Sequence, residues 1–292
     1  MDFKLSSKVL STVICALACT CGSQASGAVK PNFKVVIDPG HGGADHGTIF
    51  DNGKIRIAEK DVTLAIARQV VQKLKARGIS AALTRNSDLG LGLQARTALA
   101  NKSKANVFIS IHMNSASVKG VTDAGGIETY ILNNTSNSLS QRLAHFENAV
   151  QSPGSTLAGG EEVSDNLDVE LILKDLRLDA NLSESKLLAC ALQGSLTHVS
   201  RKIASKTRSS PTLQTMKDRG VKQALFYILM GADMPSALVE AGFLGNARDR
   251  SIVLSQEGRE AMGIAIARAV EQFRQSKVSM ETSSALSRCK VN

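Results

Sequence analysis

Short β-branched runs alternate with segments of helical periodicity along this chain, and this alternation limits its fold more than any other feature. The β-branched runs end at turn signals, and between them apolar residues recur every three or four positions. Strands are predicted at 33–37, 79–84, 107–111, 126–132 and 237–239, a strand or a helix edge at 223–229, and helices at 59–77, 94–102 and 257–274. The pattern predicts an α/β fold with an open, mixed or mostly parallel sheet and helices on both faces.

The N-terminal residues 1–28 differ from the rest of the chain. Two lysines precede a short apolar run without charges, and small residues follow it, which is typical of a signal peptide for export to the periplasm. Lipidation at Cys19 or Cys21 and an uncleaved anchor are the alternatives. The rest is predicted to be one folded domain over 29–275 and a polar, disordered tail over 276–292.

One long interruption divides the predicted sheet. Residues 133–217 begin with a stretch rich in Ser, Asn and Gly and then show helical patterns at 141–150 and 167–204. A segment of this length without a strand is not a plain loop, so we expect a helical insertion that acts as a lid or a regulatory element.

Composition narrows the range of partners and sites. The net charge is +9, but the basic residues are scattered, and aromatic residues make up 3% of the chain with no Trp. We therefore expect no nucleic-acid partner and no aromatic stacking platform. Outside the signal segment only Cys190 and Cys289 remain, far apart and without a C-x-x-C motif, so they do not predict a metal site. Whether they form a disulfide stays open at this stage.

Polar clusters follow three of the predicted strands, at 38–43, 110–114 and 239–243. Ligands bind at the carboxyl ends of the strands in open α/β sheets. Two histidines and one carboxylate are a ligand set of catalytic zinc, and His41, His112 and Glu59 supply one here. Glu240 follows its own strand and is the candidate general base. Taken singly, each histidine would more often be structural, and Glu59 would serve as a helix N-terminal charge.

Six blocks of the sequence resemble the bacterial zinc-dependent N-acetylmuramoyl-L-alanine amidases, the type 3 cell-wall amidases. The blocks keep the order of that family and lie at 36–43, 59–62, 84–85, 108–114, 126–130 and 235–246. The resemblance implies one zinc bound by His41, Glu59 and His112, with Glu240 as the catalytic residue. It also implies hydrolysis of the amide between N-acetylmuramic acid and the L-alanine of the peptidoglycan stem peptide, by a monomer that acts in wall remodelling or cell division.

The insertion resembles that of the division-associated members of this family. In those members a helix covers the site until a partner of the LytM type withdraws it. The resemblance therefore implies a LytM-type activator and an acidic residue that blocks the zinc, and we expect Glu161 or Glu162 in that role.

Two other functions compete with this interpretation. Ser183 and Lys186 have the S-x-x-K spacing of penicillin-sensitive D-Ala carboxypeptidases, although the companion motifs of that class are not evident. Chance alone predicts about two such tetrads in a chain of this composition. The second alternative is a wall-binding protein without catalytic activity, against which the retention of all four site positions argues.

Overall fold

A computed structural model describes residues 33–115, 124–149, 181–198, 216–276 and 289–291. All of them belong to one compact unit, Asn32–Asn292. The predicted signal peptide, Glu161 and Glu162 lie outside the described residues. Within the described ranges, no helix combines the length and the apolar character needed to cross a bilayer.

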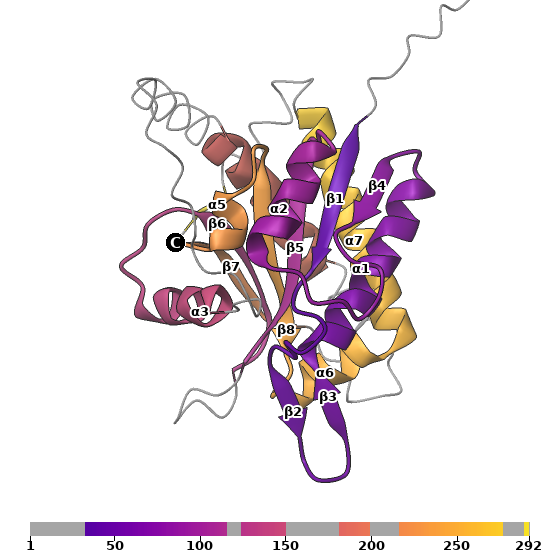
Figure 1. Ribbon diagram of the computed structural model, residues 1–292, viewed down its shortest axis with the longest axis vertical. Helices are drawn as coiled ribbons and strands as arrows, with labels where there is room; N and C mark the ends of the chain where they lie inside the picture. The colour runs from indigo at the N-terminus through magenta and orange to yellow at the C-terminus, as the bar shows by residue number, and fades with distance from the viewer. Residues whose placement is uncertain (1–32, 116–123, 150–180, 199–215, 277–288, 292) are drawn as a thin grey trace, which may run out of the picture. The chain divides into compact units, whose positions relative to one another are not determined.

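Six strands form the main sheet in the order β4-β1-β5-β8-β6-β7 (Figure 1). Four of them run parallel, and the last two run parallel to each other but antiparallel to the rest. Their bounds are β1 Lys34–Pro39, β4 Ser80–Leu83, β5 Val107–Asn114, β6 Ile127–Leu132, β7 Asp218–Ala224 and β8 Ser236–Phe243. The prediction of a mixed, mostly parallel sheet is therefore confirmed.

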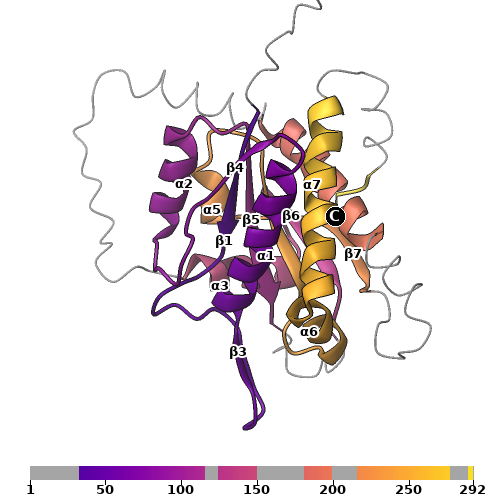
Figure 2. The same cartoon turned by 90° about the vertical axis from the view of Figure 1, so that its right-hand side faces the viewer.

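Helices cover both faces of this sheet, as predicted (Figure 2). On one face, α1 (Glu59–Lys75) and α7 (Gln256–Ser276) pack together with the helix over 181–198 on the larger hydrophobic core. The other face carries α2 (Leu93–Lys102), α3 (Ser138–Asn148) and α5 (Tyr227–Met230) on the smaller core. The short helix α6 (Ala247–Leu254) packs against α7. Every residue of β8 is buried, which is the pattern of a strand covered on both faces.

Two details differ from the predicted elements. A two-stranded hairpin, β2 (Ile49–Asp51) with β3 (Arg56–Ala58), precedes α1 and was not predicted. Each of its strands has only three residues and is largely exposed, so it leaves almost no hydrophobic pattern. The ambiguous region 223–229 contains the end of β7 and the start of α5.

The long interruption lies between β6 and β7, which pair in parallel. A parallel pair requires a crossover connection, usually a helix. The helix over 181–198 lies in this connection between β6 and β7. Its residues Leu188, Ala189 and Leu192 are fully buried in the core. The second half of the interruption is thus part of the sheet architecture, whereas α3 in the first half lies over the polar ends of the strands.

The last described residues, 289–291, are joined to the helix over 181–198 and to strand β7. Cys190 and Cys289 form a disulfide, which answers the question that the sequence left open. Val291 forms a bridge with Val221 of the edge strand β7. Most of the predicted disordered tail lies outside the described residues, but Ser276 ends α7 and residues 289–291 lie against the edge of the sheet.

Candidate metal centre and active site

His41 lies in a glycine-rich turn directly after β1. Its φ is 61°, in the left-handed region that residues other than glycine rarely adopt. A Cβ atom at Gly40 would come within 2.5 Å of the His112 ring, and one at Gly47 would come within 2.7 Å of both the His41 ring and the Glu59 carboxylate. The two glycines therefore allow the backbone to close tightly around three candidate ligands.

Glu59 and His112 are held by the elements on which the sequence predicted them. Glu59 is the first residue of α1, and its two oxygens accept hydrogen bonds from the backbone N–H groups of Thr48 and Met113, both at 2.8 Å. His112 lies near the end of β5, where its side chain is buried. The backbone thus fixes the direction of the Glu59 carboxylate.

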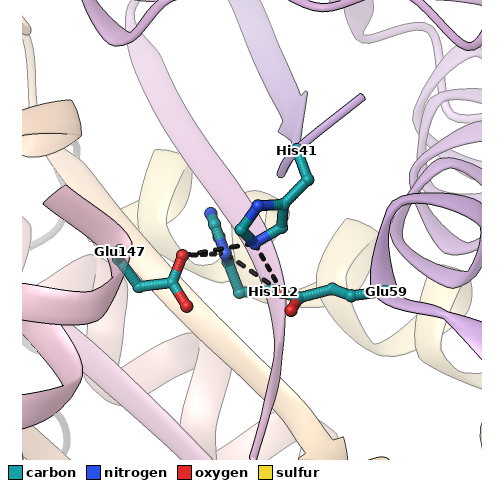
Figure 3. Close-up of side chains that lie close together, drawn as sticks. All are labelled: His41, Glu59, His112 and Glu147. Atoms are coloured by element: carbon teal, nitrogen blue, oxygen red, sulfur yellow. Dashed lines mark ion pairs between the residues drawn. The ribbon is translucent and has the colours of Figure 1, made fainter. Parts of the chain in front are cut away.

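These three side chains converge with a fourth, Glu147 (Figure 3). Oε1 of Glu59 lies 3.1 Å from Nε2 of His41 and 3.2 Å from Nδ1 of His112. Oε2 of Glu147 lies 3.3 Å from Nε2 of His41 and 2.9 Å from Nδ1 of His112. The two carboxylates approach the histidines from opposite sides, Glu59 from α1 and Glu147 from α3.

The four atoms form a group that can hold a metal ion, because all of them lie within 4.8 Å of one another. Their nitrogen–oxygen separations of 2.9–3.3 Å are close to the separation of about 3.3 Å between neighbouring ligands of zinc. All four residues are buried. His41 Nε2, His112 Nδ1 and Glu147 Oε2 have no hydrogen-bond partner among the described residues, although such buried atoms normally have one. A metal ion would satisfy all of them at once.

Asp45 orients one of these ligands and was not predicted. Its Oδ2 lies 2.7 Å from Nδ1 of His41, and its Oδ1 accepts the backbone N–H of Gly47 at 3.0 Å. A carboxylate on the second ring nitrogen fixes the tautomer and the orientation of a metal-binding histidine. Asp45 therefore leaves Nε2 of His41 available to a metal.

Two buried arginines hold the turn that carries His41. Arg96 donates to the carbonyls of Pro39 and His41, both at 2.7 Å, and Arg85 donates to that of Gly40 at 2.8 Å. The carboxylate of Asp38 lies 2.9 Å from Nη1 of Arg96 and balances its charge. The sequence marked Arg85 only as part of a motif and did not mark Arg96.

The charges of the centre strongly affect its titration. Burial lowers the pKa of His112, but the carboxylates of Glu147 and Glu59 raise it to about 10. Burial raises the pKa of Glu59, but His41 and His112 lower it below its usual range. The carboxylates thus stay ionised and favour positive charge between them, either protons on the histidines or a cation.

Glu240 lies beside this centre without being part of it. It is fully buried in β8, directly opposite His112 of β5, and neither of its oxygens has a hydrogen-bond partner among the described residues. Burial raises its pKa well above the usual value, and the nearby carboxylate of Glu147 raises it further. A raised pKa favours the uptake of a proton by this carboxylate, as a general base requires.

The structure thus brings together His41, Glu59, His112 and Glu240, and it adds Glu147. Glu147 is the one acidic residue between 133 and 150, and Ser140, Ala144 and Glu147 share the buried face of α3. A carboxylate on the inner face of an amphipathic helix in the insertion was the signal that could have identified it. Glu161 and Glu162 lie outside the described residues.

The serine alternative gains no support from its surroundings. Ser183 and Lys186 are exposed on the helix over 181–198, and no hydrogen bond joins them in the described part of the chain. They lie on the crossover helix, whereas the polar cluster with His41 lies at the ends of β1 and β5.

Comparison with known proteins places this chain among the enzymes that cleave amides in the bacterial cell wall. The family description that matches residues 35–272 is N-acetylmuramoyl-L-alanine amidase. The chain belongs to that family.

Relatives of similar length support this assignment. The chain is 30% identical to the N-acetylmuramoyl-L-alanine amidase AmiA of Escherichia coli, over 85% of this chain and 81% of AmiA. An uncharacterised protein of Bacillus subtilis, YqiI, is 31% identical over 90% of this chain and 96% of its own length. The amidase AmiC of Neisseria meningitidis is 32% identical, but the match spans 52% of that longer protein.

Solved structures agree with the fold. An N-acetylmuramoyl-L-alanine amidase of Clostridium difficile matches with a TM-score of 0.58 and 26% identity, over 84% of this chain and 98% of that chain. AmiC2 of Nostoc punctiforme matches with a TM-score of 0.55 and 28% identity, over the same shares.

Proposed function

We propose that this chain hydrolyses the amide between N-acetylmuramic acid and the L-alanine of the peptidoglycan stem peptide, with zinc held by His41, Glu59 and His112. The observation that carries the proposal is the convergence of these buried donor atoms beside the unpaired carboxyl group of Glu240. When bound in such a site, zinc supplies Lewis acidity, which activates water and polarises a carbonyl group.

The proton transfers are assigned to Glu240. Its carboxylate takes the proton of the attacking water, and the carboxyl group that results gives it to the leaving nitrogen of L-alanine. Burial and the neighbouring carboxylate of Glu147 raise the pKa of Glu240, which favours the uptake of this proton by its carboxylate. Its burial keeps competing donors away from the two oxygens.

Glu147 blocks the site in the described state. A catalytic zinc has three protein ligands and leaves its fourth position to water or substrate, but the Glu147 carboxylate lies where a fourth ligand would be. Helix α3 must therefore move before substrate can enter. Glu147 thus has the role that the sequence analysis expected for Glu161 or Glu162.

A small set of contacts holds α3 in this place. Asn148 at its end donates to the carbonyl of Leu225 at 2.7 Å and accepts the N–H of Tyr227 at 2.8 Å. Leu139 and Phe146 on its outer side are 50% and 46% exposed. We assign these apolar side chains to the contact with an activator of the LytM type, which would withdraw α3 from the site.

The place of action is outside the cytoplasm. The predicted signal peptide at 1–28 supports export to the periplasm, with lipid anchoring through Cys19 or Cys21 as its variant. The disulfide between Cys190 and Cys289 supports an oxidising compartment. Peptidoglycan, the substrate of the proposed reaction, lies in the same compartment.

The test uses residues 29–292, zinc-loaded, on isolated peptidoglycan with and without a chelator, and identifies the released fragments by mass. Free stem peptides that disappear on chelation and return with zinc are expected. Glu147→Ala should release them about 5–150-fold faster, the usual range for a coupling of 1–3 kcal/mol. Arg142→Ala, an exposed change on the same helix, is the control.

Two outcomes would contradict parts of the proposal. Release of D-Ala alone, insensitive to the chelator, would replace the zinc amidase by the serine alternative. Equal rates for the wild type and Glu147→Ala would show that α3 does not restrict the site.

A further inference from the structure

A row of charged side chains leads from the metal centre towards the edge of the sheet. His112 of β5 lies opposite Glu240 of β8, and Glu240 lies opposite Glu128 of β6. Residues opposite each other on neighbouring strands project from the same face. The pairing of β6 with β7 shifts register beside Glu128, where Arg219 of β7 contacts its carboxylate. The row therefore runs from the metal ligand through the general base to an arginine.

Two cations share one carboxylate at the outer end of this row. Both Arg219 and Lys222 pair with Oε1 of Glu128, the lysine at 2.9 Å, while the hydroxyl of Tyr130 donates to Oε2 at 2.5 Å. Burial raises the pKa of Glu128, but Lys222 and the other donors lower it below its usual range, so Glu128 stays ionised. One carboxylate thus faces two cations.

Arg219 also has unused donors. Only its Nε faces Glu128, and among the described residues no acceptor is bound to its two terminal nitrogens. The other acidic group near it is Asp249, whose carboxylate accepts the backbone N–H groups of Gly126 and Phe243. The Arg219 guanidinium lies 5.1 Å from the centre of the Phe243 ring. Stacking on a ring holds a guanidinium in place and leaves its edge free for a planar anion.

These cations lie next to the helix that blocks the site. Helix α3 packs against β7, and its buried Ser140 interacts with Tyr130. Even with α3 in place, the side chains of Arg219 and Lys222 are 24% and 16% exposed. Movement of α3 would therefore uncover the cations together with the metal centre.

We propose that Arg219 and Lys222 bind a carboxylate on the second residue of the stem peptide, the residue that follows L-alanine. This inference rests on the proposed amidase function and names a specificity-determining site for it. The ligand is a short peptide with an acidic second residue, bound in extended form across β8, β6 and β7.

Simple dimensions agree with this placement. Neighbouring strands lie about 4.8 Å apart, so two steps from β8 to β7 span about 10 Å. An extended peptide advances about 3.5 Å per residue, so the second residue's carboxylate lies about 7 Å from the scissile nitrogen. The difference between these two distances is about 3 Å. The side chains of Arg219 and Lys222 are long enough to span it, since they extend from β7 towards Glu128 of β6.

The experiment compares two substrates that differ in one group: N-acetylmuramoyl-L-alanyl-D-glutamine, in which the α-carboxylate is the free carboxylate of the second residue, and its α-amide, in which the second residue has no carboxylate. The enzyme is the zinc-loaded chain with Glu147→Ala, so that α3 does not mask the effect. We expect kcat/KM to be about tenfold higher for the acidic substrate, because charge-assisted hydrogen bonds contribute a free energy of this size. The difference should lie in a lower KM. The preference should fall as salt is raised.

Arg219→Gln and Lys222→Gln should each reduce this preference towards one, with the change expressed in KM for the acidic substrate. Arg77→Gln removes the same charge from a pair with Glu271 and should leave the preference unchanged. If Arg219→Gln alone disturbs folding, Arg219→Gln with Glu128→Gln removes both partners of the pair. Binding of the product dipeptides, measured by calorimetry, should show the same preference independently of turnover.

Equal kcat/KM and equal dipeptide binding for the acidic and amidated forms would overturn the inference and leave the amidase function intact. Absence of cleavage of both substrates would instead contradict the amidase function, and dipeptide binding would still decide whether Arg219 and Lys222 recognise the carboxylate.

Discussion

The two sides of the metal centre are built in opposite ways. His41, Glu59 and His112 come from the turn after β1, the start of α1 and β5. The backbone of the turn is held by two buried arginines, and nearby glycines leave no room for a Cβ atom. Glu147 comes from α3, whose outer face is exposed and whose end is held by the two hydrogen bonds of Asn148. The first side is part of the core, and the second is an attachment to it.

This contrast separates two properties of the site. We call the group formed by His41, Glu59 and His112 the cradle. Because it is part of the core, it keeps its ligand atoms in place whether or not the enzyme is active, since moving them would disturb the whole sheet. A ligand on a surface helix can leave at a cost of a few kcal/mol. We infer that metal binding depends on the cradle, whereas access to the metal depends on α3.

The largest effect is expected from His112→Ala. Loss of one of the three cradle ligands should abolish both zinc binding and turnover, while Glu147→Ala should retain the metal. Metal analysis after dialysis against a weak chelator measures this difference. An unchanged zinc content in His112→Ala would show that His112 is not a zinc ligand. It would also contradict the inference that metal binding depends on the cradle.

Glu240→Gln should keep zinc but lower kcat by about 10²–10⁴-fold, the usual contribution of a general acid–base group. The amide has nearly the same shape as the carboxyl group and cannot accept a proton from water. Turnover of peptidoglycan and metal content are measured on the same preparation. Full activity in this variant would show that another group takes the proton.

Asp38→Asn tests how the pair of Asp38 with Arg96 stabilises the turn that carries His41. Removing the charge that balances buried Arg96 should lower the free energy of unfolding by about 3 kcal/mol at neutral pH. Burial raises the pKa of Asp38, but Arg96 and the hydrogen bonds of Thr84 and Ser110 lower it below the usual range. Its contribution is therefore complete above about pH 4 and is lost as the pH falls below that value.

Denaturant unfolding between pH 3 and pH 7 measures this pH dependence. The difference between wild type and Asp38→Asn should shrink on the acid side. Asp61→Asn, an exposed change in the first turn of α1, is the matched control. A difference that stays constant down to pH 3 would contradict the assignment of the effect to the Asp38 charge.

The smallest effect is expected from Asn148→Ala. Two hydrogen bonds at a partly exposed site contribute about 1 kcal/mol in total, so their loss should raise basal activity about fivefold. Gln141→Ala is the control, because its side chain bonds to Thr135 within the same segment. A lower activity in Asn148→Ala would mean that α3 supports the active site instead of closing it.

The sequence predicted much of the sheet and the site because the signals were local. Strands β1 and β5 contain short runs rich in apolar and β-branched residues, and α1 and α7 show their buried faces at helical spacing. The residues of the cradle stand directly at the ends of these elements, so His41, Glu59 and His112 could be selected before any coordinates were known.

Contacts between distant segments carry no such local signal. Glu147 was passed over because only tertiary packing brings α3 to the ends of β1 and β5. Arg96 was passed over for the same reason, since it supports a turn more than fifty residues away. The disulfide of Cys190 with Cys289 and the row from Glu240 to Arg219 likewise depend on strand order, which the spacing of residues along the chain does not contain.

The amino-acid sequence by itself determined the fold class and supplied the three candidate metal ligands and the candidate general base, because periodicity and strand-end chemistry are properties of short segments. Only the tertiary structure decided which further carboxylate lies against the two histidines and which cations pair with Glu128. Those neighbours are selected by the free energy of packing the whole sheet, to which every strand and helix contributes.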